Sequence, residues 1–308
     1  MEGYDEERGN DMQTHSWFGL LHTTGTVLVL ASVSACCKHG AQREETPSVG
    51  SAPATSSVAP APRAVALGKM PANTSVVFLH HSTGENIWNG GVAGAISAHN
   101  ARAGTSYRVT PLAFPHDPYP WDNYPYDYWN IWVKNAGPSP YQGQETLEML
   151  TKDHQVIVFK HCYPVSAIEQ DGGAGDVSSS QKTLPNYKLQ YQALKAKLRS
   201  FPSTRFIVWT GAALTKTAMR EKYGGDDEMA GRVKQFFTWV TGSWDEPGDN
   251  IFVFDFFALE TEGGSHLLDR HAQDAWDSHP NESFAKQAAP RFAQRIIDVI
   301  EGRGDQGR

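Results

Sequence analysis

The sequence predicts an α/β protein in which a mostly parallel central sheet lies between two layers of helices. Short, continuously apolar segments such as VVFLH (76–80), QVIVFK (155–160) and RFIVWT (205–210) favour buried strands, because they are rich in β-branched and aromatic residues. Amphipathic segments with a helical period separate them. Strands that alternate with helices form a parallel sheet covered on both faces, which is a three-layer α/β/α arrangement.

The predicted elements follow each other along the chain in this alternating order. The expected strands are 75–80, 107–110, 155–160, 205–210 and 251–257. The expected helices are 91–100, 144–152, 187–201, 229–240 and a last one that begins near Asn281, with Asn281 or Ser283 as its cap. The last helix carries one apolar ridge, formed by Phe284, Ala288, Phe292, Ile296 and Ile300.

Composition excludes several classes of protein. The chain has 308 residues, enough for one large domain with extensions, and its net charge of -7 argues against nonspecific binding to nucleic acid. The three cysteines, Cys36, Cys37 and Cys162, form no C-x-x-C pair, so a structural zinc site is not expected. We expect no metal and no cofactor.

The N-terminal region has the pattern of an export signal. Residues 17–35 are uncharged and largely apolar, and they end in Val33-Ser34-Ala35-Cys36. Small residues before a cysteine resemble a bacterial lipobox, in which Cys36 would be lipidated and would anchor the protein to a membrane. The acidic start of the chain is atypical, and translation from Met12 would remove these acids. An ordinary secretory signal or an uncleaved anchor is the alternative.

These patterns divide the chain into four parts. Residues 1–36 are the signal and lipobox segment, and 37–72 form a tether rich in Pro, Ala and Ser that favours extended backbone. Residues 73–303 are the folded domain, and 304–308 are a tail. The expected location is the bacterial cell envelope, or the periplasm or medium if the chain is not lipidated.

Two short segments at opposite ends of the predicted domain carry the candidate chemistry. VVFLHHSTGE (76–85) is a strand that stops at Ser82, and DSHPN (277–281) places Asp277 two residues before His279, ahead of the last helix. A hydroxyl at the carboxyl end of a strand, a late histidine and a nearby carboxylate are the parts of a Ser-His-Asp hydrolase. In a parallel sheet such groups meet beyond the carboxyl ends of the strands.

This arrangement resembles the SGNH (GDSL-like) hydrolase superfamily over residues 73–303. The resemblance implies a flavodoxin-like fold, Ser82 as the nucleophile and His279 as the general base. The family motif is D-x-x-H, which would put the acid at Trp276, so Asp277 is the first choice and Asp274 the alternative. A Ser-His dyad without an acid also occurs in the superfamily.

The resemblance also implies an oxyanion hole, meaning hydrogen-bond donors aimed at the tetrahedral intermediate. The Ser82 N–H is the first candidate donor, and a glycine after the second strand, Gly137 or Gly143, is the second. The family's third donor is an asparagine in a G-x-N-D motif, where this chain has KHCYP (160–164) and Cys162 falls at about the asparagine position. Lys160 or His161 would then substitute electrostatically.

Three further features leave alternatives open. His80 and His81 are interpreted as a packing and a hydrogen-bonding histidine, and Cys162 is a less favoured nucleophile. The aromatic segment 114–141 contains Trp121, Tyr124, Tyr126, Tyr128, Trp129 and Trp132. It suits either a sugar ring or aryl ester at the site mouth, which we favour slightly, or a loop packed on its own side chains.

The sequence therefore predicts an envelope-anchored serine esterase that hydrolyses carboxylic esters, with carbohydrate O-acetyl esters as the first substrate hypothesis and lipid or small acyl esters still open. The alternative from another class is a non-catalytic glycan-binding module on the same fold. A transferase that uses the same serine is a third option, since a fold does not fix a function.

Overall fold

The computed structural model describes residues 67–170 and 173–306. Its centre is a five-stranded sheet in which every pair of neighbouring strands is parallel. The strands are β1 (Ser75–His80), β2 (Arg108–Ala113), β3 (Val156–Lys160), β4 (Arg205–Trp209) and β5 (Ile251–Phe254). Strands β3, β4 and β5 are buried along their whole length, as expected for a sheet covered on both faces.

The strand order is β2-β1-β3-β4-β5, which is the flavodoxin-like order. The chain moves outward from β1 to β2, and then crosses back over β1 to β3 before it continues to β5. The predicted three-layer α/β/α fold with a parallel, flavodoxin-like sheet is therefore confirmed.

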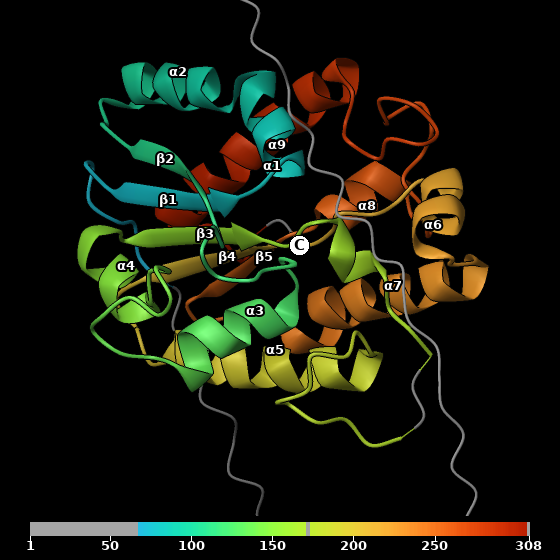
Figure 1. Ribbon diagram of the computed structural model, residues 1–308. Helices are drawn as coiled ribbons and strands as arrows, with labels where there is room; N and C mark the ends of the chain where they lie inside the picture. Colours follow the sequence, from blue (N-terminus) through green and yellow to red (C-terminus); the bar gives the residue numbers. More distant parts are fainter. Residues whose placement is uncertain (1–66, 171–172, 307–308) are drawn as a thin grey trace, which may run out of the picture. The chain divides into compact units, whose positions relative to one another are not determined.

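Helices cover both faces of the sheet (Figure 1). They are α1 (Thr83–Ile87), α2 (Ala93–Ala103), α3 (Pro125–Trp129), α4 (Leu147–Asp153), α5 (Leu184–Arg199), α6 (Lys216–Tyr223), α7 (Asp227–Trp239), α8 (Phe256–Thr261) and α9 (Glu282–Ile300). Short π-helical turns lie at Trp88–Val92, Asn130–Lys134 and Val240–Trp244, and a 3₁₀ turn lies at Tyr163–Ser166. Within the described ranges, no helix is both long and apolar enough to span a bilayer.

Two apolar cores hold the helix layers on the sheet. Residues of α1, α2 and α9 pack on one face, around Phe78, Trp209 and Phe292. Residues of α3, α5 and α7 pack on the other face, around Phe159, Tyr191 and Phe236. Side chains alternate across a strand, so consecutive residues of one strand enter opposite cores.

Most predicted elements occur within a few residues of their expected bounds, and two differences have a clear cause. The expected strand 251–257 ends at Phe254, because the Asp255 carboxylate accepts a hydrogen bond from the Ala258 N–H and starts α8. The last helix is capped by Asn281, whose Oδ1 accepts from the Phe284 N–H at 2.9 Å, and not by Ser283.

The two ends of the described domain lie against the sheet and against α9. The Met70 N–H donates to the Ile300 carbonyl at 2.8 Å, and Leu67 packs against the core that includes α9. The Gly304 carbonyl accepts a hydrogen bond from Arg295. The predicted signal segment, Cys36 and the tether up to residue 66 lie outside the described residues.

Candidate active site

The site lies at the carboxyl ends of β1 and β3, where the order of the sheet reverses. β1 leads outward to β2, and β3 lies on its other side. Such a switch point is where open α/β sheets form their binding crevice. Ser82 follows β1 and Cys162 follows β3. Their side chains meet there, with Ser82 Oγ 3.4 Å from Cys162 Sγ.

Helix α1 fixes the backbone at Ser82. The Asn86 N–H donates to the Ser82 carbonyl at 2.9 Å, and the Gly84 N–H donates to the His81 carbonyl at 2.8 Å. The chain therefore turns from β1 directly into a helix, with Ser82 at the junction. This places the Ser82 hydroxyl, which is half-buried, at the edge of the sheet.

The candidate base, His279, and the candidate acid, Asp277, lie in one loop that a backbone hydrogen bond closes. The Gln273 N–H donates to the His279 carbonyl at 2.8 Å, and this contact closes the loop at its base. Inside the loop, Asp277 Oδ1 lies 2.5 Å from His279 Nδ1 and also accepts from the His279 N–H at 3.0 Å. Although burial raises the pKa of Asp277, these two contacts hold it below its usual value. The Nδ1 contact leaves His279 Nε2 as the nitrogen for proton transfer.

The two candidate acids have different positions. The Asp277 carboxylate contacts the imidazole of His279. Asp274 Oδ1 instead accepts hydrogen bonds from the backbone N–H groups of Trp276 at 2.7 Å and of Asp277 at 2.8 Å. Asp274 therefore shapes the turn that carries Asp277. The geometry favours Asp277 over Asp274 as the partner of His279.

Tyr163 and Asn86 connect the His279 loop to the Ser82 side. The Tyr163 ring, next to Cys162 in the chain, packs edge-on against the His279 ring with centroids 5.0 Å apart. Asn86 Nδ2 donates to the carbonyl of Pro280 at 3.0 Å. In the part of the chain that the structure describes, the Ser82 hydroxyl contacts Cys162 and makes no hydrogen bond to His279. Catalytic hydrogen bonds are often long or poorly aligned before substrate binds.

The candidate oxyanion donors separate into two groups. Ser82 and Cys162 lie at the crevice. The Gly137 N–H instead donates to Glu148 Oε2 at 3.2 Å, and Gly143 lies against Pro118 in the turn from Tyr141 to Gln144. The loop after β2 reaches the site through a residue that sequence reasoning missed, namely Asn123.

Asn123 is buried and has a positive φ of 55°. Its carbonyl accepts a hydrogen bond from the Cys162 N–H at 2.9 Å, which fixes the chain after β3. Asparagine tolerates this left-handed conformation better than most residues do. An asparagine in the context WDNYP is therefore a sequence signal for a turn at this position.

The histidines next to the site are structural in this conformation. His80 is buried and stacks on Phe78, and His81 Nε2 contacts the Pro115 carbonyl while its ring stacks on Trp121 with centroids 4.1 Å apart. The prediction of one packing and one hydrogen-bonding histidine is confirmed. His161 points into the opposite core, where its Nε2 lies 2.7 Å from the Tyr191 hydroxyl, so it is not at the crevice.

Two buried histidines make the fold sensitive to acid. Burial, and to a smaller extent the Lys160 charge, lowers the pKa of His80 to about 4 and that of His161 to about 3. The unfolded chain takes up these protons near pH 6.5, so stability is lost as the pH falls from about 6.5 towards 4. At pH 5 we expect each histidine to reduce the free energy of unfolding by about 2 kcal/mol relative to pH 7.

Urea unfolding of wild type and His161→Gln at pH 7 and pH 5 measures this contribution. The glutamine can still hydrogen-bond Tyr191 but does not titrate. We expect the variant to lose about 2 kcal/mol less than wild type between the two pH values. An equal loss in both proteins would show that His161 is not buried as a neutral group.

The aromatic segment belongs mostly to the core. Four of its named rings, those of Tyr124, Tyr128, Trp129 and Trp132, are buried, so the slightly favoured interpretation as a substrate platform is wrong for most of the segment. The rings of Tyr124, Tyr128 and Trp132 belong to the apolar core on the face of the sheet that α3, α5 and α7 cover. Trp121 and Tyr126 are half-buried, and Trp121 reaches the site through its stack on His81.

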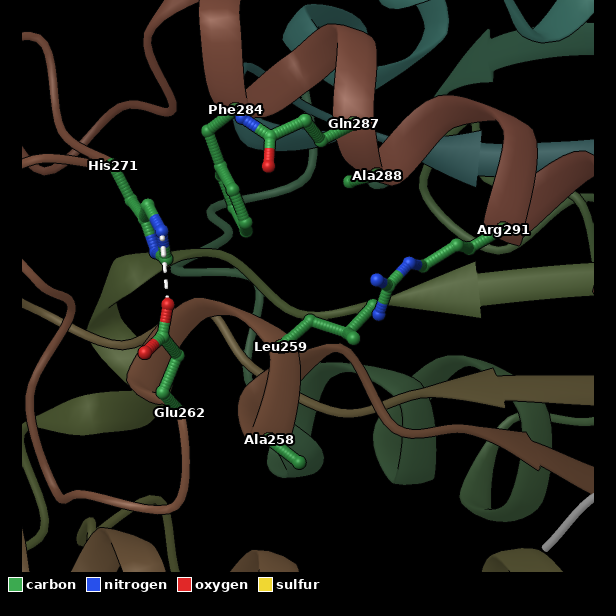
Figure 2. A pocket seen from close by; sticks show the side chains of 8 residues that line it. All are labelled: Ala258, Leu259, Glu262, His271, Phe284, Gln287, Ala288 and Arg291. Carbon is green, nitrogen blue, oxygen red and sulfur yellow. Dashed lines mark ion pairs between the residues drawn. The ribbon is translucent and has the colours of Figure 1, made fainter.

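Two described pockets differ in their relation to the site. One of about 320 Å³ lies between α8 and α9, as Figure 2 shows, and none of the candidate catalytic residues lines it. Its His271 and Glu262 form an ion pair at 3.4 Å. The other, of about 290 Å³, adjoins the His279 loop, and is lined by Asn86, Asn89, Gly90, Gln273, Pro280, Glu282, Ala285 and Lys286.

Comparison with known proteins gives a likeness of fold. No protein-family model and no curated protein sequence matches the chain. Similar solved structures include an acetyl xylan esterase, at 14% identity and a TM-score of 0.45, over 72% of this chain and 100% of the other. A gut microbial diltiazem-metabolizing enzyme has 14% identity and a TM-score of 0.45. The match covers 78% of this chain but only 49% of the length of that enzyme.

A third similar structure is the periplasmic domain of a lipopolysaccharide acetyltransferase from Salmonella ser. Paratyphi A. It has 13% identity and a TM-score of 0.40, over 73% of this chain and 84% of the other. At such low identity the likeness concerns the fold alone, and any function has to be inferred from the residues of this chain.

Proposed function

We propose that this protein is an esterase of the SGNH type, with Ser82 as nucleophile, His279 as general base and Asp277 as the acid that orients it. One observation carries the proposal. At the switch point of the sheet, contacts run without a break from Ser82 to Cys162, through Tyr163 to the His279 ring, and from His279 Nδ1 to Asp277.

The proposed reaction uses two steps. Ser82 Oγ attacks the ester carbonyl carbon while His279 Nε2 takes the hydroxyl proton, and the C–O bond then breaks as the alcohol leaves with that proton. Water, deprotonated by His279, then attacks the carbonyl carbon of the acyl-Ser82 ester. The bond from this carbon to Ser82 Oγ breaks, the acid is released, and His279 returns the proton to Ser82 Oγ. The Ser82 N–H and the Cys162 thiol are the proposed donors to the developing oxyanion, although a thiol is a weak donor.

The surroundings of His279 support a carbohydrate ester as substrate. Trp276 is 55% exposed, and Asp274 holds its backbone in a defined turn three residues before His279. A fixed, exposed indole offers a flat apolar face to a sugar ring. The pocket of about 290 Å³ on the other side of Pro280 adds amide and charged groups that can bind hydroxyls.

Trp276→Ala tests this part of the proposal. We expect the KM for an acetylated oligosaccharide to rise about 10-fold, which is ~1.4 kcal/mol, because the sugar loses its stacking surface. The kinetics on 4-nitrophenyl acetate, which has no sugar, should stay unchanged. Leu189→Ala removes another exposed apolar side chain, on α5, and serves as the matched control. Equal KM values for wild type and Trp276→Ala on the glycan would remove the carbohydrate assignment.

We also propose that the enzyme is exported and anchored to the cell envelope through a lipid on Cys36. What supports this is the apolar run 17–35 before Ser34-Ala35-Cys36 and the Pro/Ala/Ser-rich segment that follows. Labelling of expressing bacteria with an alkyne fatty acid should mark the wild-type protein but not Cys36→Ala. Label that persists in Cys36→Ala would contradict the anchor.

A second candidate function is a glycan-binding module without turnover. What favours it is that Ser82 Oγ contacts Cys162 Sγ rather than the imidazole, and that Cys162 replaces a stronger amide donor. Binding of acetylated glycan that survives in Ser82→Ala, together with no acetate release by wild type, would support the module over the esterase.

A further inference from the structure

Lys160 is a fully buried lysine that the reaction described above does not use. It ends β3, its side chain is not exposed, and its Nζ has no hydrogen-bond partner among the described residues. A buried ammonium without a partner costs several kcal/mol. A lysine at this position therefore has to be explained by what surrounds it.

The Lys160 side chain runs directly beneath the first turn of α1. A Cβ built on Gly84 would lie 2.9 Å from Lys160 Cδ and 2.6 Å from the Cβ of His80. Only a glycine lets α1, which begins just after Ser82, approach this closely. Burial, and to a smaller extent the charge of Lys160, lowers the pKa of His80 to about 4, so His80 stays neutral beside the lysine.

Glu260 on α8 is a second buried ionisable residue of this region. It is 1% exposed, its Oε1 accepts the Ala213 N–H at 2.7 Å, and its Oε2 has no hydrogen-bond partner in the described ranges. Burial raises the pKa of Glu260, while the Ala213 N–H and the Lys160 charge oppose that rise. In the same way, burial lowers the pKa of Lys160, while Cys162 and Glu260 oppose that fall.

Lys160 therefore interacts electrostatically with a buried acidic side chain and with a residue that contacts Ser82. When protonated, its ammonium group interacts favourably with Glu260 and with Cys162, two residues further along the chain, whose Sγ lies 3.4 Å from Ser82 Oγ. A cation next to a thiol draws electron density from the S–H bond and makes it a better donor. In a dry environment, a fixed charge close to a developing oxyanion has a much larger effect than in water.

We propose that Lys160, with Glu260 as its counter-charge, is a positioning residue for acyl transfer at Ser82. It acts through Cys162 and through the start of α1, and it supplies positive charge on the β3 side of the oxyanion site, where no amide side chain is present among the described residues of the 160–164 segment. This inference rests on the proposed esterase function.

The test compares kcat and KM on 4-nitrophenyl acetate for full-length Lys160→Met, Glu260→Gln and the double variant. Methionine keeps the length of the side chain and removes its charge. We expect Lys160→Met to lower kcat about 100-fold with KM nearly unchanged, since the charge acts on the transition state. The matched control is Lys195→Met, which removes another buried lysine, on α5, and should change kcat by less than about threefold.

The double variant separates a shared role from general damage. If the two residues work as a pair, Lys160→Met/Glu260→Gln should have the kcat of Lys160→Met alone within about threefold. Because it leaves no unpaired charge, it also provides the measurement if Lys160→Met alone does not fold. A kcat near that of wild type in any folded variant that lacks Lys160, or losses that multiply in the double variant, would overturn the inference.

Ser82→Ala distinguishes this failure from failure of the proposed function. If Ser82→Ala retains ester hydrolysis, the esterase proposal itself fails. If Ser82→Ala abolishes hydrolysis while Lys160→Met keeps the wild-type kcat, only the role of Lys160 is wrong.

Discussion

Ser82→Ala is expected to reduce the kcat for ester hydrolysis by at least about 10⁴-fold, the order of loss that follows when a catalytic serine is removed. The hydroxyl is the only group removed, and the described contact that it makes is the long one to Cys162 Sγ at 3.4 Å. Its removal should therefore leave the free energy of unfolding within about 1 kcal/mol of wild type.

Acetate release and urea unfolding, measured on the same preparations, check this result. Ser97→Ala, at an exposed position on α2, is the matched control and should change neither quantity. A folded Ser82→Ala protein that retains more than a tenth of the wild-type kcat would show that another group carries out the chemistry.

Asp277→Asn should lower kcat by about 10³- to 10⁴-fold. The amide oxygen can still accept the His279 N–H, which keeps the loop closed. However, an amide cannot hold the imidazole in the tautomer that leaves Nε2 free as a base, nor stabilise the imidazolium that forms. KM should change little, because the carboxylate faces His279.

Asp274→Asn is the matched comparison in the same loop. Its oxygen accepts only backbone N–H groups, a role that the asparagine oxygen can also fill, so kcat should fall by less than about fivefold. If Asp274→Asn were the more damaging change, the acid would be Asp274 and the loop would rearrange when substrate binds.

The layered fold could be predicted because each strand carries its own signal. A run such as QVIVFK is apolar on both faces, and this pattern is typical of a strand in a sheet that helices cover on both sides. Helix α1 could not be predicted, because its five residues include a glycine and show no helical period. It forms because its start is fixed by β1 and its inner face packs against Lys160 and α9.

The candidate site could be predicted only where the reactive side chains and the pattern that identifies them lie in the same short segment. Asp277 and His279 are two residues apart, and Ser82 directly follows a strand, so both ends could be recognised. The sheet topology brings Asn123 to Cys162, and its context WDNYP indicates a turn but not this contact. The local sequence of Glu260 likewise gives no sign of its interaction with Lys160. The aromatic segment misleads because composition does not reveal which rings enter the core.

The most direct measurement is the reaction of the full-length protein with a fluorophosphonate probe, followed by mass spectrometry of the modified peptide. We expect the wild-type protein to be phosphonylated on Ser82, and we expect Ser82→Ala and His279→Ala not to be labelled under the same conditions. Absence of label on folded wild-type protein, or label on another residue, would contradict an activated Ser82 and with it the proposed esterase.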